Sequence, residues 1–131
     1  MHSLIVDDVF ILRKMLSKVL SKFSTCDFAE NGDVAITKFE KSLNTSPYDL
    51  VCMDIMMPNT DGKKAVEMIR LLEKQNNIQL ADRVKIIMIT VMSYDSEVTC
   101  SAECGCDAYL LKPLDVDKFL KKLEELKLIK N

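Results

Sequence analysis

Acidic, hydroxyl and basic residues follow short apolar runs at four places in the sequence. Asp7 and Asp8 come directly after the run that ends at Val6, and Asp54 comes after the run Leu50 to Met53. Thr90 ends the run 84–90, and Lys112 follows the run 107–111. Short apolar runs bounded by polar or turn-forming residues are typical of buried strands. Each of these side chains is therefore expected where the chain leaves a sheet.

These residue types suit phosphoryl chemistry if the fold brings them together. Three clustered carboxylates repel one another and require a counter-charge. Carboxylate oxygens without His or Cys favour Mg²⁺, and Lys112 would supply a second positive charge. A metal ion, an ammonium group and the Thr90 hydroxyl could together hold a phosphoryl group. A carboxylate inside that set, such as Asp54, could act as the nucleophile.

The remaining pattern predicts elements that would bring these residues to one edge. Strands and helices of ordinary length alternate, which indicates a parallel sheet with helices on both faces. The carboxyl ends of such strands share one edge, where ligands bind in open α/β sheets. We expect helices to be capped by Asp8, Asp33 and Asp115. Strands are predicted at 3–6, 25–29, 50–53, 84–90 and 107–111, and helices at 9–22, 33–43, 63–74, 93–105 and 115–128.

Composition narrows the possible classes of protein. The chain has 131 residues, of which 48% are hydrophobic and 29% charged, so one globular domain over residues 1–131 is expected. A formal net charge of −2 gives no reason to expect direct nucleic-acid binding. No apolar run approaches the ~18 residues of a membrane helix, and no signal peptide is evident, so we expect a cytoplasmic protein without membrane contact.

The five cysteines do not form a recognisable metal or disulfide pattern. Three of them are spaced C-x3-C-x-C from Cys100 to Cys106, which lacks the paired C-x2-C spacing of zinc sites. An odd number of cysteines in an intracellular chain argues against a disulfide framework. We interpret them mainly as small buried apolar residues, with a redox-sensitive thiol as the alternative.

Several short motifs, taken in order, resemble those of one family. They are the pair Asp7-Asp8, the pattern D-x3-P-x3-G at Asp54, Pro58 and Gly62, the residue Thr90, and Y-L-x-K-P at 109–113. With these, essentially the whole chain resembles the CheY-like receiver domains of two-component response regulators. The resemblance implies a flavodoxin-like (βα)5 fold, in which a doubly wound, five-stranded parallel sheet has the strand order 2-1-3-4-5.

The resemblance also implies a role for each matching residue at the site. Asp54 would accept a phosphoryl group from a phosphohistidine on a histidine kinase or a histidine phosphotransfer protein. Asp8, Asp54 and the backbone carbonyl of Met56 would bind Mg²⁺, and Asp7 would help to position the ion. Lys112 would pair with Asp54 or with its phosphoryl oxygen.

Signalling would follow from movements around the fifth strand. Thr90 would move to hydrogen-bond the phosphoryl group, and Tyr109 would turn inward. The surface formed by the fourth helix, the fifth strand and the fifth helix would then change, and a downstream target would bind there. The Lys112-Pro113 peptide bond is expected to be cis, and the chain to be a monomer or a phosphorylation-dependent dimer.

Some residues depart from the family pattern. Val91 follows Thr90 where a smaller residue is usual, and could narrow the space next to the site. Met56 and Met92 occupy positions that tune hydrolysis in the family. Two apolar side chains do not activate water, so we expect a long-lived phosphoryl group.

Other interpretations remain open from the sequence alone. The chain could be a Mg²⁺-dependent phosphatase with an aspartyl nucleophile, although such enzymes carry a second Asp where Met56 stands. It could also be a pseudo-receiver that only binds a partner. Residue by residue, Asp7 and Asp8 could cap a helix, Asp54 could form a turn, and Tyr109 could be ordinary strand packing. Thr90 and Lys112 could likewise be an ordinary strand-end residue and a solvated lysine.

Overall fold

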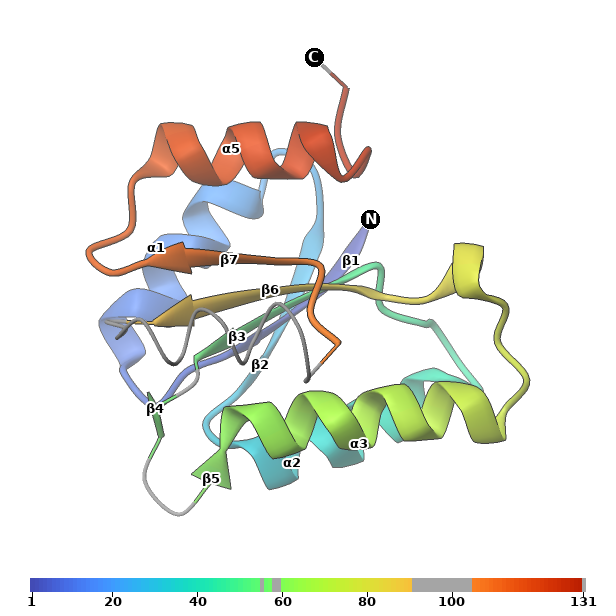
Figure 1. The fold of residues 1–131 in the computed structure, drawn as a ribbon. Helices are drawn as coiled ribbons and strands as arrows, with labels where there is room; N and C mark the ends of the chain where they lie inside the picture. The colour runs from blue at the N-terminus through green and yellow to red at the C-terminus, as the bar shows by residue number, and fades with distance from the viewer. Residues whose placement is uncertain (55, 58–59, 91–104, 131) are drawn as a thin grey trace.

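Five parallel strands form the centre of the molecule. The computed structural model describes residues 1–54, 56–57, 60–90 and 105–130. The sheet has the order β2-β1-β3-β6-β7, which confirms the predicted order 2-1-3-4-5 when β6 and β7 are counted as the fourth and fifth strands (Figure 1). Its strands are β1 (His2–Val6), β2 (Thr25–Ala29), β3 (Leu50–Asp54), β6 (Lys85–Thr90) and β7 (Ala108–Leu111).

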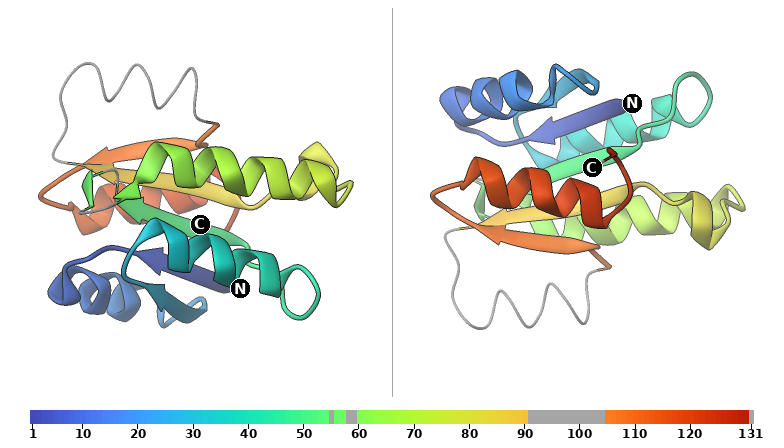
Figure 2. Two further views of the ribbon diagram at one scale, coloured as in Figure 1. Left: turned by 90° about the horizontal axis from the view of Figure 1, so that it is seen from below. Right: turned by 90° about the horizontal axis from the view of Figure 1, so that it is seen from above.

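Helices cover both faces of this sheet, as the alternating pattern predicted. On one face lie α1 (Phe10–Leu20) and α5 (Val116–Glu125), and on the other lie α2 (Gly32–Ser42) and α3 (Gly62–Gln75) (Figures 1 and 2). Phe119 packs in the core under α1 and α5, and Phe39 packs in the core under α2 and α3. The fold is therefore a doubly wound α/β sandwich with two hydrophobic layers.

The continuous apolar run in β6 reflects burial on both faces of the sheet. Ile86 and Met88 belong to the core beneath α2 and α3, whereas Ile87 and Ile89 belong to the core beneath α1 and α5. All four side chains are almost fully buried. Strands enclosed on both sides lose the polar alternation of half-exposed strands.

The predicted cap of α1 is wrong. The residue before the helix is Val9, which makes no side-chain capping hydrogen bond, and the Asp8 side chain is exposed. The neighbouring Asp7 instead accepts a hydrogen bond from the Val9 N–H at 2.8 Å. Asp8 belongs to the acidic cluster described below. The side-chain hydrogen bond just before α1 is made by Asp7 and not by Asp8.

Of the caps predicted for α2 and α5, the first is wrong and the second is confirmed. Asn31, not Asp33, caps α2 by accepting a hydrogen bond from the Val34 N–H at 2.9 Å. Asp115 caps α5 as predicted and accepts a hydrogen bond from the Lys118 N–H at 3.2 Å. The helix start in α2 lies one residue earlier than expected, which places Asp33 in the first turn.

Three shorter elements complete the described part of the chain. The strands β4 (Met56–Met57) and β5 (Thr60–Asp61) pair antiparallel between β3 and α3, and the 3-10 helix η1 (Leu80–Asp82) lies in the connection before β6. The helix α5 ends three residues earlier than the expected residue 128. The helix predicted at 93–105 lies almost entirely outside the described residues. None of the described helices is long and apolar enough to cross a bilayer.

Candidate functional site

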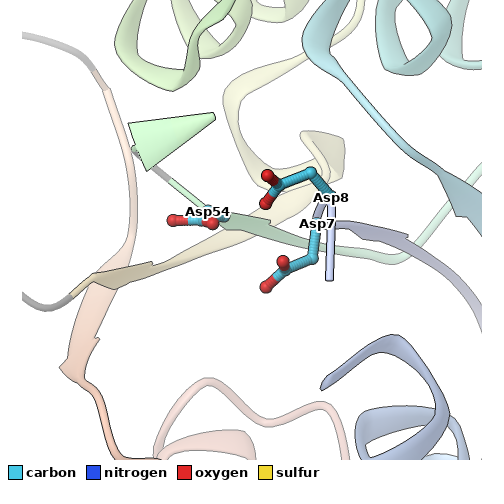
Figure 3. Close-up of side chains that lie close together, drawn as sticks. All are labelled: Asp7, Asp8 and Asp54. Carbon is cyan, nitrogen blue, oxygen red and sulfur yellow. The ribbon is translucent and has the colours of Figure 1, made fainter. Parts of the chain in front are cut away.

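Three carboxylates meet at the carboxyl edge of the sheet. Asp7 and Asp8 follow β1, and Asp54 is the last residue of the adjacent strand β3. Each contributes a carboxylate oxygen to a group in which these atoms lie within 4.8 Å of one another. Figure 3 shows the three side chains gathered at the ends of β1 and β3. The predicted acidic cluster therefore exists, because parallel neighbouring strands end side by side.

Lys112 provides positive charge within this cluster. Its Nζ lies 3.1 Å from Oδ2 of Asp54 and 3.5 Å from Oδ2 of Asp7. The lysine side chain is 16% exposed and each carboxylate side chain only 4%. Lys112 follows β7, which is separated from β3 by β6, so the ammonium group reaches the site from two strands away. Low exposure makes these charge pairs stronger than pairs on the open surface.

The pKa of Asp7 reflects both the burial and the charges of the cluster. Burial is the largest effect, and it raises the pKa of this carboxyl above its ordinary value. The charges of Asp54 and Asp8 act in the same direction, whereas the Val9 N–H and Lys112 lower the pKa. One ammonium group thus does not fully compensate three acids. Oxygen ligands with excess negative charge and no nearby His or Cys fit a hard divalent cation such as Mg²⁺.

Backbone contacts hold Asp7 in place. Its N–H donates to the carbonyl of Ala29 at 3.1 Å, which ties the end of β1 to β2. Its own carbonyl accepts a hydrogen bond from Arg13 at 2.7 Å. Arg13 was not predicted as a site residue, since the periodicity of α1 shows only that it lies off the apolar face. No local sequence signal identifies a hydrogen bond from a helix side chain back to a strand end.

The structure also places the backbones of Thr90 and Met56 near this edge. Thr90 is the last residue of β6, whose register sets Ile89 opposite Asp54 and Thr90 opposite Leu111. Met56 lies two residues after Asp54 in β4. Their side chains are not among those described, so their predicted roles remain predictions. Pro58, Val91 and Met92 lie outside the described residues.

Tyr109 and the Lys112-Pro113 bond lie on the side of β7. The peptide bond is cis, as predicted. Tyr109 pairs with Met88 of β6 and packs, partly buried, against the core beneath α2 and α3. The predicted switching role is not tested by this arrangement.

Sequence reasoning missed a buried ionic network at the edge of the sheet opposite to the site, where β6 and β7 begin. The Arg70 side chain of α3 donates to Glu73 and to Asp107, each at 2.8 Å. It also donates to the carbonyls of Val84 and Gly105, at 2.8 and 2.9 Å. The network fixes α3 against the segments that enter β6 and β7. The helical periodicity placed Leu72 on the apolar side of α3 but gave no sign that the next residue, Glu73, is 2% exposed.

A second missed cluster lies on the β1 and β2 side of the sheet. The Tyr48 hydroxyl donates to Oδ2 of Asp27 at 2.6 Å, and Nε2 of His2 lies 3.0 Å from the same oxygen. The Tyr48 hydrogen bond is the largest effect on Asp27, and it lowers the pKa of that carboxyl. The three residues come from β1, β2 and the loop before β3, so only the folded sheet brings them together.

Comparison with known proteins assigns this architecture and acidic edge to one family. The family described as the response regulator receiver domain matches residues 3–124. The chain belongs to this family. A receiver domain is the phosphoacceptor module of two-component signalling, and the CheY-like, flavodoxin-like fold predicted from the sequence is confirmed.

Relatives of this receiver domain include both small and larger proteins. The chemotaxis protein CheY of Bacillus subtilis is 34% identical over 124 residues, which cover 93% of each chain. The transcriptional regulatory protein ResD of Bacillus subtilis is also 34% identical over 124 residues, but the match spans only 46% of its length. A CheX–CheY–BeF3–Mg²⁺ complex from Borrelia burgdorferi contains a chain of similar fold, with a TM-score of 0.82 and 26% identity over 96% of this chain and 88% of that one.

Proposed function

We propose that Asp54 is the phosphoacceptor of this receiver domain and that a phosphohistidine on a histidine kinase or histidine phosphotransfer protein is the donor. The contact between Lys112 Nζ and Asp54 Oδ2 at 3.1 Å carries this assignment. Lys112 also contacts Asp7, but at the longer distance of 3.5 Å, and Asp7 additionally accepts a hydrogen bond from the Val9 N–H. A turn-forming Asp at position 54 would need no buried ammonium partner.

The chemistry requires a carboxylate nucleophile and stabilised phosphoryl charge. An Asp54 oxygen attacks the phosphorus atom, a P–O bond forms, and the P–N bond to the imidazole breaks. The leaving imidazole takes up a proton from a group of the donor protein or from water. Lys112 is placed to neutralise negative charge on the phosphoryl oxygens as they approach Asp54. Lys112 would thus pair with Asp54 before the reaction and with the phosphoryl oxygens during it, which fits its burial at the edge of the sheet.

We also propose that Asp7, Asp8, Asp54 and the carbonyl of Met56 hold Mg²⁺. The three carboxylates have oxygen atoms close enough to share one ion. When bound, the ion would supply positive charge to the phosphoryl oxygens. The CheX–CheY–BeF3–Mg²⁺ complex contains a chain of similar fold together with Mg²⁺ and BeF3, which supports the choice of Mg²⁺ as the ion.

Phosphorylation is proposed to act on the β7 side of the molecule. Thr90 and Tyr109 would respond to the phosphoryl group, and the face built from the fourth helix, β7 and α5 would present a changed surface to a downstream target. The part of this face contributed by residues 91–104 lies outside the described residues. One domain over residues 1–131, a cytoplasmic location, and a monomer or phosphorylation-dependent dimer remain predictions.

Self-modification, not turnover of a substrate, is the activity we assign. The domain would catalyse only its own phosphorylation and dephosphorylation. The alternative, an aspartyl-nucleophile phosphatase, needs a general acid two residues after the nucleophile, and Met56 occupies that position. A pseudo-receiver is disfavoured because Asp54, Lys112 and both preceding acids are present.

Incubation with acetyl phosphate and MgCl₂ tests the proposal directly. Intact mass should increase by one phosphoryl group in the wild type and remain unchanged in Asp54→Asn. Asp82→Asn, which removes an exposed acid in η1, is the matched control and should be labelled like the wild type. Equal labelling of Asp54→Asn, or no labelling of the wild type, would contradict the assignment.

A further inference from the structure

A groove lies at the edge of the sheet opposite to β7, between α1 and α2. Its volume is about 530 Å³, within the range of pockets that bind small ligands or side chains. Phe28 of β2 is part of its lining, and β2 and β7 are the two outer strands of the sheet (Figure 2). The residues that matter for its chemistry are Phe10, Arg13, Lys14, Phe28, Glu30 and Lys38. The groove touches the phosphorylation site only through Arg13, which donates to the carbonyl of Asp7, and the face expected to switch does not include it.

Two aromatic side chains in the groove are unusually exposed. Phe10 is 63% exposed and Phe28 is 39% exposed. Large apolar side chains gathered in one hollow, with polar groups around them, mark interaction sites more often than isolated exposed residues do. Aromatic residues in such positions commonly carry much of the binding energy at interfaces. Phe10 belongs to neither hydrophobic core, so packing of the fold does not explain an aromatic residue at this position.

Three cations surround these rings. Arg13 Cζ and Lys14 Nζ each lie 5.8 Å from the centre of the Phe10 ring, and Lys38 donates a hydrogen bond to the carbonyl of Phe28. Among the described residues, no carboxylate forms an ion pair with any of the three. The groove thus presents cations without an ion-paired carboxylate, although Glu30 lines it and the charge of Lys38 acts on Asp27.

We propose that this groove is a docking site for an acidic protein segment that inserts an apolar side chain between Phe10 and Phe28. Because the cations lie beside the aromatic ring, a carboxylate that pairs with them must sit next to an apolar group of the same ligand. A segment with alternating or neighbouring acidic and apolar residues meets this requirement. A partner bound here would leave the β7 face free.

Two other anionic partners fit the groove less well. Segments that bind anionic lipid usually carry clusters of about 4–8 basic residues on an open surface, whereas this site has three cations and an acid in a hollow. Nucleic-acid binding normally involves a basic face, and the net charge of this chain is −2. The protein segment is therefore the occupant that the charges and the shape favour.

Binding of labelled peptides to the full chain tests this proposal. The probe is a short fluorescein-labelled peptide in which Phe and Leu alternate with Glu, followed by fluorescence anisotropy and by ¹H–¹⁵N spectra. We expect binding with shifts confined to α1, β2 and α2. Lys14→Glu, at an exposed position, should weaken binding about tenfold or more, and Phe28→Ser should weaken it as well. Lys74→Glu, on the exposed side of α3, is the matched control and should bind like the wild type.

Peptides of altered composition and lipid vesicles give the opposing outcomes. A peptide with Lys in place of Glu, or with Ser in place of Phe and Leu, should not bind. Equal binding of either peptide, unchanged binding by Lys14→Glu, shifts centred on β7 and α5, or no binding up to about 1 mM would overturn the proposal. Binding of phosphatidylserine vesicles without peptide binding would likewise overturn it in favour of a membrane contact. None of these outcomes depends on phosphorylation of Asp54.

Discussion

Replacement of Arg70 by Ala should destabilise this receiver domain strongly. The substitution removes hydrogen bonds to two carboxylates and two carbonyls, all between 2.8 and 2.9 Å. The side chains of Arg70 and Glu73 are 11% and 2% exposed, so Glu73 would keep a buried charge and, among the described residues, only the Val84 N–H as a donor. Loss of one partner of a buried ion pair typically costs about 3–5 kcal/mol.

Urea unfolding measures this loss. With a slope near 2 kcal/mol/M, a loss of about 3 kcal/mol would lower the unfolding midpoint by about 1.5 M. Lys122→Ala is the matched control, because it removes a lysine from an exposed ion pair with Glu125, and its midpoint should equal that of the wild type. The double variant Arg70→Met, Glu73→Gln should be more stable than Arg70→Ala, since it removes the unpaired charge at Glu73. Asp107, which is 18% exposed, loses Arg70 in both variants and keeps the Ile86 N–H as a donor.

The reasoning would be refuted by a small effect. A loss below about 1 kcal/mol for Arg70→Ala would mean that water or rearrangement replaces the network at little cost. Equal stability of Arg70→Ala and the double variant would show that the unpaired Glu73 carboxylate is not the source of the loss. Either result would remove the network as the element that fixes α3 against β6 and β7.

Three further predictions follow from other contacts. Lys112→Met leaves two buried carboxylates without their ammonium partner. Without divalent cations, the free energy of unfolding should therefore fall by about 3 kcal/mol. The control Lys121→Met, at an exposed position, should match the wild type. Tyr48→Phe removes the main cause of the lowered pKa of Asp27, so the free energy of unfolding should fall by about 1 kcal/mol or less near pH 7, because Asp27 is about half exposed. A lowered pKa stabilises the fold above the ordinary pKa of the acid and not below it, so this difference should vanish as the pH falls through the folded-state pKa; a constant difference would contradict it. The apolar Met56 and Met92 predict a phosphoryl group that persists in Mg²⁺ without a phosphatase, and hydrolysis within seconds in a quench time course would disprove this.

The fold could be predicted from the sequence because its strands are strongly apolar and end at polar residues. Within the run 84–90, residues 86–89 are buried on both faces, as the lack of polar alternation indicated. Asp54 and Lys112 could be placed together because parallel strands share a carboxyl edge. Their separation along the chain did not matter, since both follow strands of one sheet.

Contacts between side chains of distant elements could not be predicted in this way. Arg70 reaches residues 35 and 37 positions away, and helical periodicity carries no information about those partners. The cap of α1 was predicted wrongly for a related reason. Asp7 and Asp8 both suit a helix start, and only the turn at the end of β1 shows that Asp7 binds the Val9 N–H while Asp8 joins the acidic cluster.

Chemical identification of the phosphorylated residue tests the central claim most directly. After phosphorylation with acetyl phosphate and MgCl₂, borohydride converts an aspartyl phosphate to homoserine, and peptide mass spectrometry locates the converted residue. The account predicts homoserine at position 54 alone, with Asp7 and Asp8 unchanged. Homoserine at position 7 or 8, or no conversion in a phosphorylated sample, would contradict the assignment of Asp54 as the phosphoacceptor.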